Sequence, residues 1–101
     1  MQNTLAIAHK FEQFVTVYGD DPFISKTLTK MVSTRVAKLN KELKSVNQAL
    51  SRFERIYGKT SDYFFKEYQN GSAGDEIDCI EWASLVMMRD RLLAELAALQ
   101  A

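Results

Sequence analysis

The sequence has few of the residue types from which most active sites are built. Its 101 residues include one cysteine, one histidine and one proline. The single cysteine, Cys79, cannot close an intramolecular disulfide or form a cysteine-based metal site. His9, the single histidine, leaves no basis for a catalytic triad or a histidine metal site. We therefore expect a protein that is not an enzyme and that uses no cofactor and no metal.

The chain also lacks a long apolar run and a basic-then-apolar signal pattern at its N-terminus. These absences predict a cytoplasmic protein with no membrane partner. A hydrophobic content of 47% with 26% charged residues is ordinary for a folded chain, and the length predicts a single domain, residues 1–101. Few helix breakers and no alternating β-branched runs predict an all-α fold.

The strongest pattern is a heptad repeat of apolar residues at steps of four and three. We call these residues the seam: Val32, Val36, Leu39, Leu43, Val46, Leu50, Phe53 and Tyr57. An average period of 3.5 residues predicts one long helix, residues 22–57, with one apolar side. Asp21 can cap this helix and Pro22 can take its first position, while Gly58 suits its C-terminal end.

Three further helices are predicted, one before the long helix and two after it. Residues 1–20 predict an N-terminal helical arm, capped by Asn3 or Thr4. The segment 58–75 predicts a connection with a short helix, for which Thr60 and Ser61 are suitable caps. Residues 76–101 predict a C-terminal helix capped by Asp75.

The C-terminal helix is about as long as the seam, so folding back antiparallel would cover the seam end to end. Its apolar surface is wider than one neighbouring helix needs. We therefore predict a long antiparallel helical hairpin, coiled-coil-like, that dimerises into a helical bundle. The residues expected to close and anchor the turn of this hairpin are Gly58, Ser61, Phe64, Phe65, Gly74, Asp75 and Trp82.

Charge is unevenly distributed although the net charge is zero. Residues 26–59 carry most of the cations, and residues 62–81 are acidic. The acidic group is explained by helix capping and the helix dipole rather than by a metal. Five cations form a basic face opposite the seam: Lys38, Lys41, Lys44, Arg52 and Arg55. A solvated outer face of the helix explains these cations best. Binding of nucleic acid is disfavoured, because no recognition helix and no interleaved aromatic residues accompany the cations. An acidic protein partner stays open.

From Tyr57 onward, the chain resembles a family of small bacterial and archaeal helical proteins. The matching residues are Tyr57-Gly58, Ser61, Phe64-Phe65, Gly71, Gly74-Asp75, Asp78, Glu81-Trp82 and Leu85. They follow the signature YG-x-[ST]-S-x-x-F…G-x-x-GD-x-x-D-x-x-EW, and the resemblance covers about residues 22–97. It implies the antidote half of a toxin–antitoxin pair, or an uncharacterised protein, that blocks a small toxin sterically. The chain departs from many antitoxins in having no DNA-binding module.

The sequence thus predicts a protein–protein interaction module that forms a homodimer and binds a protein client such as a small toxin. Two alternatives stay open. One is a nucleic-acid-associated helical protein that uses the basic face of residues 38–59. The other is a structural coiled-coil subunit with no separate client.

Overall fold

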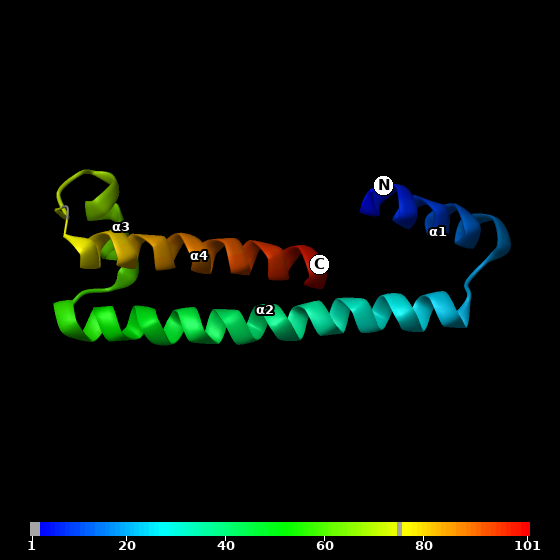
Figure 1. Ribbon diagram of the computed structural model, residues 1–101, viewed down its shortest axis with the longest axis horizontal. Coiled ribbons are helices and arrows are strands. Elements are labelled where there is room, and N and C mark those ends of the chain that lie inside the picture. The colour runs from blue at the N-terminus through cyan, green and yellow to red at the C-terminus, as the bar shows by residue number, and fades with distance from the viewer. Residues whose placement is uncertain (1–2, 75) are drawn as a thin grey trace. The chain divides into compact units, whose positions relative to one another are not determined.

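The computed structural model describes residues 3–74 and 76–101, and these residues form four helices and no strand (Figure 1). The prediction of an all-α protein is confirmed. Contacts divide the chain into two compact units, unit 1 up to Arg35 and unit 2 from Val36 to Ala101. Helix α2 (Pro22–Tyr57) supplies residues to both units. That the chain forms a single domain stays a prediction.

Unit 1 consists of α1 (Thr4–Tyr18) and the first part of α2. Asn3 is the N-cap of α1, since its side-chain oxygen accepts a hydrogen bond of 2.8 Å from the Ala6 amide. Asp21 does the same for α2, accepting a bond of 3.1 Å from the Ile24 amide, and Pro22 takes the first helical position. These helix starts were predicted from the sequence and are confirmed.

Unit 1 has almost no core of its own. Among its described residues only Ile24 is buried, and α1 buries none of its side chains. The apolar stripe of α1 is therefore present in the sequence without being covered in the single chain.

Unit 2 consists of residues 36–57 of α2 together with α3 (Ser61–Gln69) and α4 (Ile77–Gln100). Gly58 follows α2 with a φ of 66°, a left-handed conformation that glycine adopts readily. The N-cap of α3 is Thr60, whose hydroxyl accepts a bond of 3.1 Å from the Tyr63 amide. Ser61, the other predicted cap, is instead the first residue of the helix.

The predicted cap of the last helix, Asp75, lies outside the described residues. Glu76 occupies the N-cap position of α4 without a side-chain hydrogen bond to the helix. Helix α4 begins at Ile77, one residue after the start of the predicted range 76–101.

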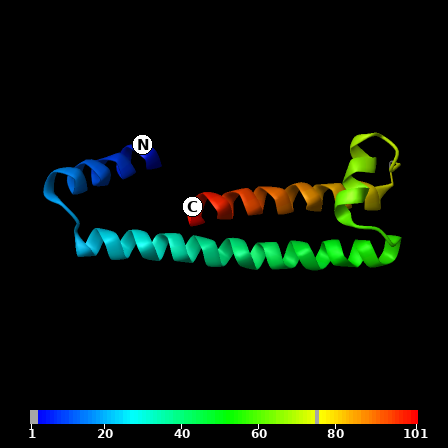
Figure 2. The same cartoon turned by 180° about the vertical axis from the view of Figure 1, so that it is seen from behind.

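Within unit 2, α4 lies alongside residues 36–57 of α2 and runs in the opposite direction, as both views show (Figures 1 and 2). Side chains of α2, α3 and α4 form one apolar core. Its buried members are Leu39, Val46, Leu50, Phe64, Trp82, Ala83, Val86, Leu92 and Leu96. Around this core pack half-buried seam residues such as Val36, Leu43 and Phe53.

The seam is not covered end to end. Val32 and Tyr57, its first and last residues, are 41% and 40% exposed. At the last residues of the seam, the ring of Phe53 stacks on that of Trp82, and the Tyr57 hydroxyl bonds to Asp78.

Candidate interaction surfaces

The turn end of unit 2 is organised around Trp82, which is 1% exposed. The ring of Phe64 stacks on the indole with 3.9 Å between centroids and 3° between planes. The rings of Phe53 and Tyr57 each lie 5.5 Å from the indole, at 13° and 25°. Trp82 thus joins α2, α3 and α4 through aromatic contacts, which contribute beyond the area they bury.

Ser61 satisfies the polar edge of this aromatic group. Its hydroxyl accepts a hydrogen bond of 3.0 Å from Nε1 of Trp82, and both side chains are buried. The Ser61 amide in turn donates a bond of 2.8 Å to the carboxylate of Glu54 on α2. A buried indole N–H without an acceptor would be costly, so Ser61 has a structural role here.

Tyr57 and Asp78 connect the end of α2 to the start of α4. The Tyr57 hydroxyl donates a hydrogen bond of 2.5 Å to the Asp78 carboxylate. This bond, with smaller effects of burial and of the negative charges nearby, raises the pKa of Tyr57 to about 12. The phenol therefore stays protonated well above its ordinary range while the chain is folded.

The remaining turn residues shape the bend. Gly74, like Gly58, has a positive φ, of 92°. Phe65 is half-buried, and its ring stacks on that of Tyr68 with 6.2 Å between the ring centroids. The structure thus brings Ser61, Phe64 and Trp82 together in the core, where a client cannot reach them. The middle of the seam is covered in the same way, by α4.

Sequence reasoning treated the surplus apolar residues of α4 as one broad surface and did not select a site among them. Ile77, Ile80, Ser84 and Met87 follow one another at steps of three, four and three, which places them on one side of α4. Ile77, Ile80 and Met87 are 80%, 51% and 52% exposed. We call these four residues the outer stripe.

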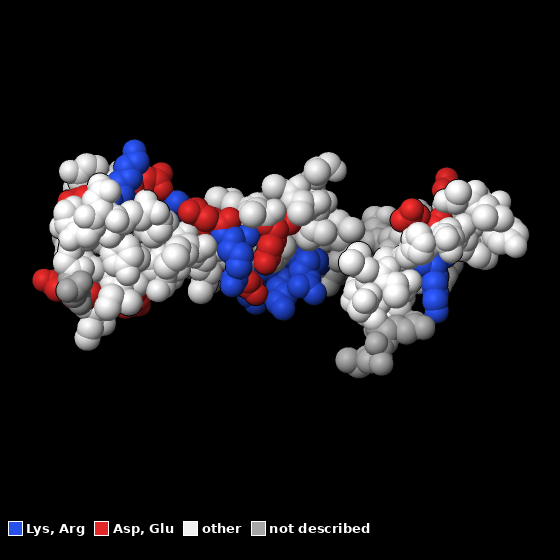
Figure 3. Space-filling model, turned by 90° about the horizontal axis from the view of Figure 1, so that it is seen from above, with Lys and Arg blue, Asp and Glu red and all other residues white. Residues whose placement is uncertain are grey.

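The polarity of the outer stripe is low even at its serine. The Ser84 hydroxyl donates a hydrogen bond of 3.0 Å to the Ile80 carbonyl, so its polar group is already satisfied within the helix. Figure 3 looks onto α4 from the side opposite α2. On that face, uncharged atoms dominate the α3 end of unit 2, and charged side chains gather further along α4.

The five residues of the basic face are all exposed, and none forms an ion pair with a described residue. This sets them apart from Lys59, which binds Glu67 at 2.7 Å, and from Arg89, which binds Asp62 at 2.8 Å.

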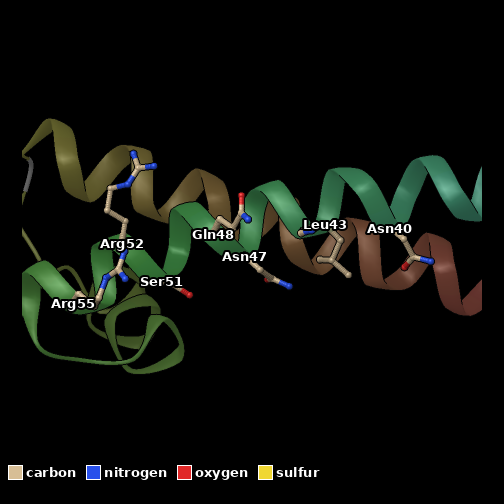
Figure 4. Close-up of a pocket in the computed structure, with 8 residues that line it drawn as sticks. Asn40, Leu43, Asn47, Gln48, Ser51, Arg52 and Arg55 are labelled. Carbon is tan, nitrogen blue, oxygen red and sulfur yellow. The ribbon is translucent and has the colours of Figure 1, made fainter.

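A groove of about 670 Å³ runs along this side of α2 (Figure 4). Three of the basic residues line it, together with amide and hydroxyl side chains and one seam residue. Its lining is Asn40, Leu43, Lys44, Asn47, Gln48, Ser51, Arg52 and Arg55. Lys38 and Lys41 do not belong to it, so the predicted basic face is divided between the groove and the neighbouring surface.

Within residues 3–74 and 76–101, no three His, Cys, Asp or Glu side chains are grouped so that they could hold a metal ion. Over the same residues, no helix combines the length and apolarity required to cross a membrane.

In comparisons with known proteins, no family model matches the chain, and no curated protein and no solved structure matches it.

Proposed function

We propose that the chain is a non-catalytic protein–protein interaction module. In this proposal α2 and α4 form a long antiparallel helical hairpin whose outer stripe binds a protein client. One observation carries the proposal: Ile77, Ile80 and Met87 are exposed at helical spacing on a helix that buries Trp82, Ala83 and Val86 on its other side.

Packing against α2 and α3 supports this use of the outer stripe. Trp82, Ala83 and Val86 are each at most 1% exposed, so the orientation of α4 about its own axis is fixed by its buried side. The outer stripe is consequently held on a rigid element, which lowers the entropy cost of binding. A contiguous apolar surface on a folded chain is typical of interaction sites.

The character of the outer stripe fits an apolar helix or groove on the client. Methionine is flexible and polarizable, so Met87 can adapt to a partner surface, whereas the branched side chains of Ile77 and Ile80 are stiffer anchors. Charged groups further along α4, such as the pair of Arg91 and Glu95 at 4.0 Å, would form a polar rim.

The signature around Ser61 and Trp82 supports one class of client. Its resemblance to small antidote proteins suggests a small toxin, blocked sterically by the bound hairpin. The signature residues themselves would then act indirectly, because they lie in the core that fixes α4 and leave the outer stripe to make the contact.

The test is co-expression of the full chain with the small protein encoded by an adjacent gene. We expect the chain to restore growth and to co-purify with that protein. Ile80→Glu combined with Met87→Glu should abolish both effects, because it places charge in an apolar interface. Tyr63→Glu, a change at an equally exposed residue of α3, is the control and should leave both intact.

Circular dichroism must show unchanged helicity for each variant. If the chain gives no protection, or if the double variant protects as well as the unaltered chain, the proposal is wrong.

The unpaired cations of the basic face favour a second candidate, a helical protein that contacts the phosphates of nucleic acid. Binding of a labelled RNA or DNA duplex should then weaken steeply with salt, and charge reversal at Lys41, Lys44 and Arg55 should remove it. Reversal at Lys26 and Lys30, exposed cations of unit 1, serves as the matched control. Binding that is insensitive to salt would contradict this candidate.

A further inference from the structure

The turn that follows α3 contains the one asparagine–glycine pair of the chain, Asn70-Gly71, and both residues are exposed. Asparagine is among the thermolabile residues of proteins, and the residue after it decides how readily its side chain reacts. Glycine has no Cβ, so no side chain shields its backbone nitrogen from the preceding residue. The other asparagines, Asn3, Asn40 and Asn47, precede threonine, lysine and glutamine. Asn70 is therefore the asparagine whose side chain a backbone nitrogen reaches most easily.

The chain leaves α3 through a Schellman motif built on this pair. Asn70 is the C-cap of the helix, and Gly71 follows it with a φ of 77°. The Gly71 amide donates a hydrogen bond of 3.1 Å to the Tyr68 carbonyl, and the Ser72 amide donates one of 2.9 Å to the Glu67 carbonyl. These bonds satisfy carbonyls that have no partner within the helix. The motif thus holds the last turn of α3 closed.

The last turn is important because α3 has only nine residues. Phe64, near the middle of α3, stacks on Trp82 with 3.9 Å between the ring centroids. Glu67, whose carbonyl belongs to the Schellman motif, forms an ion pair of 2.7 Å with Lys59 through its side chain. A helix this short is marginal without its caps and its packing. Loss of the motif should therefore weaken the helix that covers Trp82.

The conformation of Asn70 in the motif restrains its reaction. Its ψ of −3° turns the Gly71 nitrogen away from the Asn70 side chain. To reach Cγ of Asn70, this nitrogen must rotate about the Cα–C bond, which breaks its hydrogen bond to Tyr68. Helix ends open at a low free-energy cost, whereas Asn40 and Asn47 lie in the interior of α2. The reactive conformation is therefore reached far more often at Asn70 than at these two residues.

We propose that Asn70 is a site of spontaneous deamidation and that the product breaks the Schellman motif at the end of α3. Once the turn opens, solvent hydroxide removes the proton of the Gly71 amide, and the nitrogen attacks Cγ of Asn70. A bond forms between these two atoms, the Cγ–Nδ2 bond breaks, and Nδ2 takes a proton from water and leaves as ammonia. Water then opens the five-membered succinimide at either carbonyl carbon, which gives aspartate or isoaspartate at position 70.

Both products act on the same helix end. Each adds a negative charge at the C-terminus of α3, where the helix dipole disfavours it. Isoaspartate also adds a methylene carbon to the backbone, so the hydrogen bonds from Gly71 and Ser72 lose their spacing. The modified chain should therefore hold α3 less firmly against Trp82. The inference goes beyond the proposed function and does not depend on it, because neither the outer stripe nor the basic face takes part.

The experiment is incubation of the full chain at mildly alkaline pH, followed by peptide mass spectrometry and by enzymatic methylation, which detects isoaspartate. We expect the mass gain at Asn70 to be at least about tenfold faster than at Asn40 or Asn47, because a helix end opens more readily than a helix interior. The net charge should change from zero by one negative charge, which separates the product by ion exchange. Asn70→Gln should stop this change, since glutamine would need a six-membered ring. Asn47→Gln is the matched control and should leave the rate unaltered.

The melting temperature of the separated product tests the structural consequence. The isoaspartate form should melt at a lower temperature than the unmodified chain. Asn70→Asp carries the added charge without the extra methylene, so it should lower the melting temperature less. A mass gain at other residues with none at Asn70, no gain at any asparagine, or an isoaspartate form that melts with the unmodified chain would each overturn the proposal.

Discussion

Unit 1 and unit 2 both carry large apolar side chains on their helices, yet they bury them to very different extents. Nine buried hydrophobic residues form one core in unit 2, whereas the described part of unit 1 buries Ile24 alone. Phe11 and Phe64, both on short helices, illustrate the contrast: Phe11 is 43% exposed and Phe64 is 1% exposed. An apolar stripe therefore predicts that a helix forms, but it does not say whether the same chain covers the stripe.

The difference arises from the number of helices that meet. In unit 2, α2, α3 and α4 converge on Trp82, so an aromatic side chain can be surrounded. In unit 1 only two helical segments meet, and two helices leave part of each apolar side in contact with water. Unit 2 accordingly covers its aromatic side chains around Trp82, while unit 1 leaves most of its apolar side chains exposed.

Truncating Trp82 should have the largest effect and would show how much of unit 2 depends on one side chain. Trp82→Ala removes the contacts with Phe64, Phe53 and Tyr57, so we expect a loss of about 3–5 kcal/mol in the free energy of unfolding. Urea unfolding followed by circular dichroism measures it. A loss below about 1 kcal/mol would mean that this core is not formed in solution.

A matched pair of leucines tests the comparison directly. Leu92 is fully buried in unit 2, so Leu92→Ala should lower the free energy of unfolding by about 2–5 kcal/mol. Leu5 is exposed on α1, so Leu5→Ala should lower the free energy of unfolding by no more than about 0.5 kcal/mol. Fluorescence of Trp82, the single tryptophan, reports on unit 2 during urea unfolding. Equal effects of the two changes would contradict the contrast between the units.

Replacing Ser61 should destabilise the chain less, and it tests how much the hydrogen bond in the core contributes beside the apolar contacts. Ser61→Ala leaves Nε1 of Trp82 buried without its acceptor, and we expect a loss of about 1–3 kcal/mol. Thr60→Ala, at the adjacent N-cap, should cost about 1 kcal/mol through a different mechanism, the loss of the cap. If Ser61→Ala proves neutral in thermal unfolding, the hydrogen bond does not contribute to stability.

The smallest expected effect is a pH dependence at the end of α2. The folded chain raises the pKa of Tyr57 from 10.0 to about 12, so the unfolded chain loses this proton first as the pH rises. The contribution of Tyr57 to stability is complete below pH 10 and is lost as the pH rises through about 12. Tyr57→Phe should remove this loss of stability, so the melting temperature of the variant should fall less between about pH 10 and pH 12 than that of the unaltered chain. Identical profiles would show that the bond to Asp78 is not maintained.

Much of the helical architecture could be predicted because its signals are local. The caps Asn3 and Asp21, the break at Gly19 and the helix from Pro22 to Tyr57 each depend on neighbouring residues and on backbone preferences. The N-terminus of α4 was placed less accurately: the sequence favoured Asp75 as its cap, whereas Glu76 occupies the N-cap position without a side-chain hydrogen bond to the helix.

The candidate surfaces were less accessible to sequence reasoning. The apolar surplus of α4 was visible, but its division into a buried side with Ala83 and Val86 and an outer stripe with Ile80 and Met87 required the packing of the neighbouring helices. The basic face was visible from its heptad positions. That it carries no ion pair with a described residue depended on where the acidic side chains of α3 and α4 lie.

By itself the sequence determined where most of the helices begin and end and which of their sides are apolar, because capping, turn geometry and helical periodicity act over a few residues. Only the tertiary structure decided which apolar residues are covered. Val46 and Val32 occupy the same heptad position of α2, yet Val46 is 5% exposed and Val32 is 41% exposed. Coverage of Val46 depends on the side chains of α3 and α4 that form one core with it, and these residues are distant in the sequence.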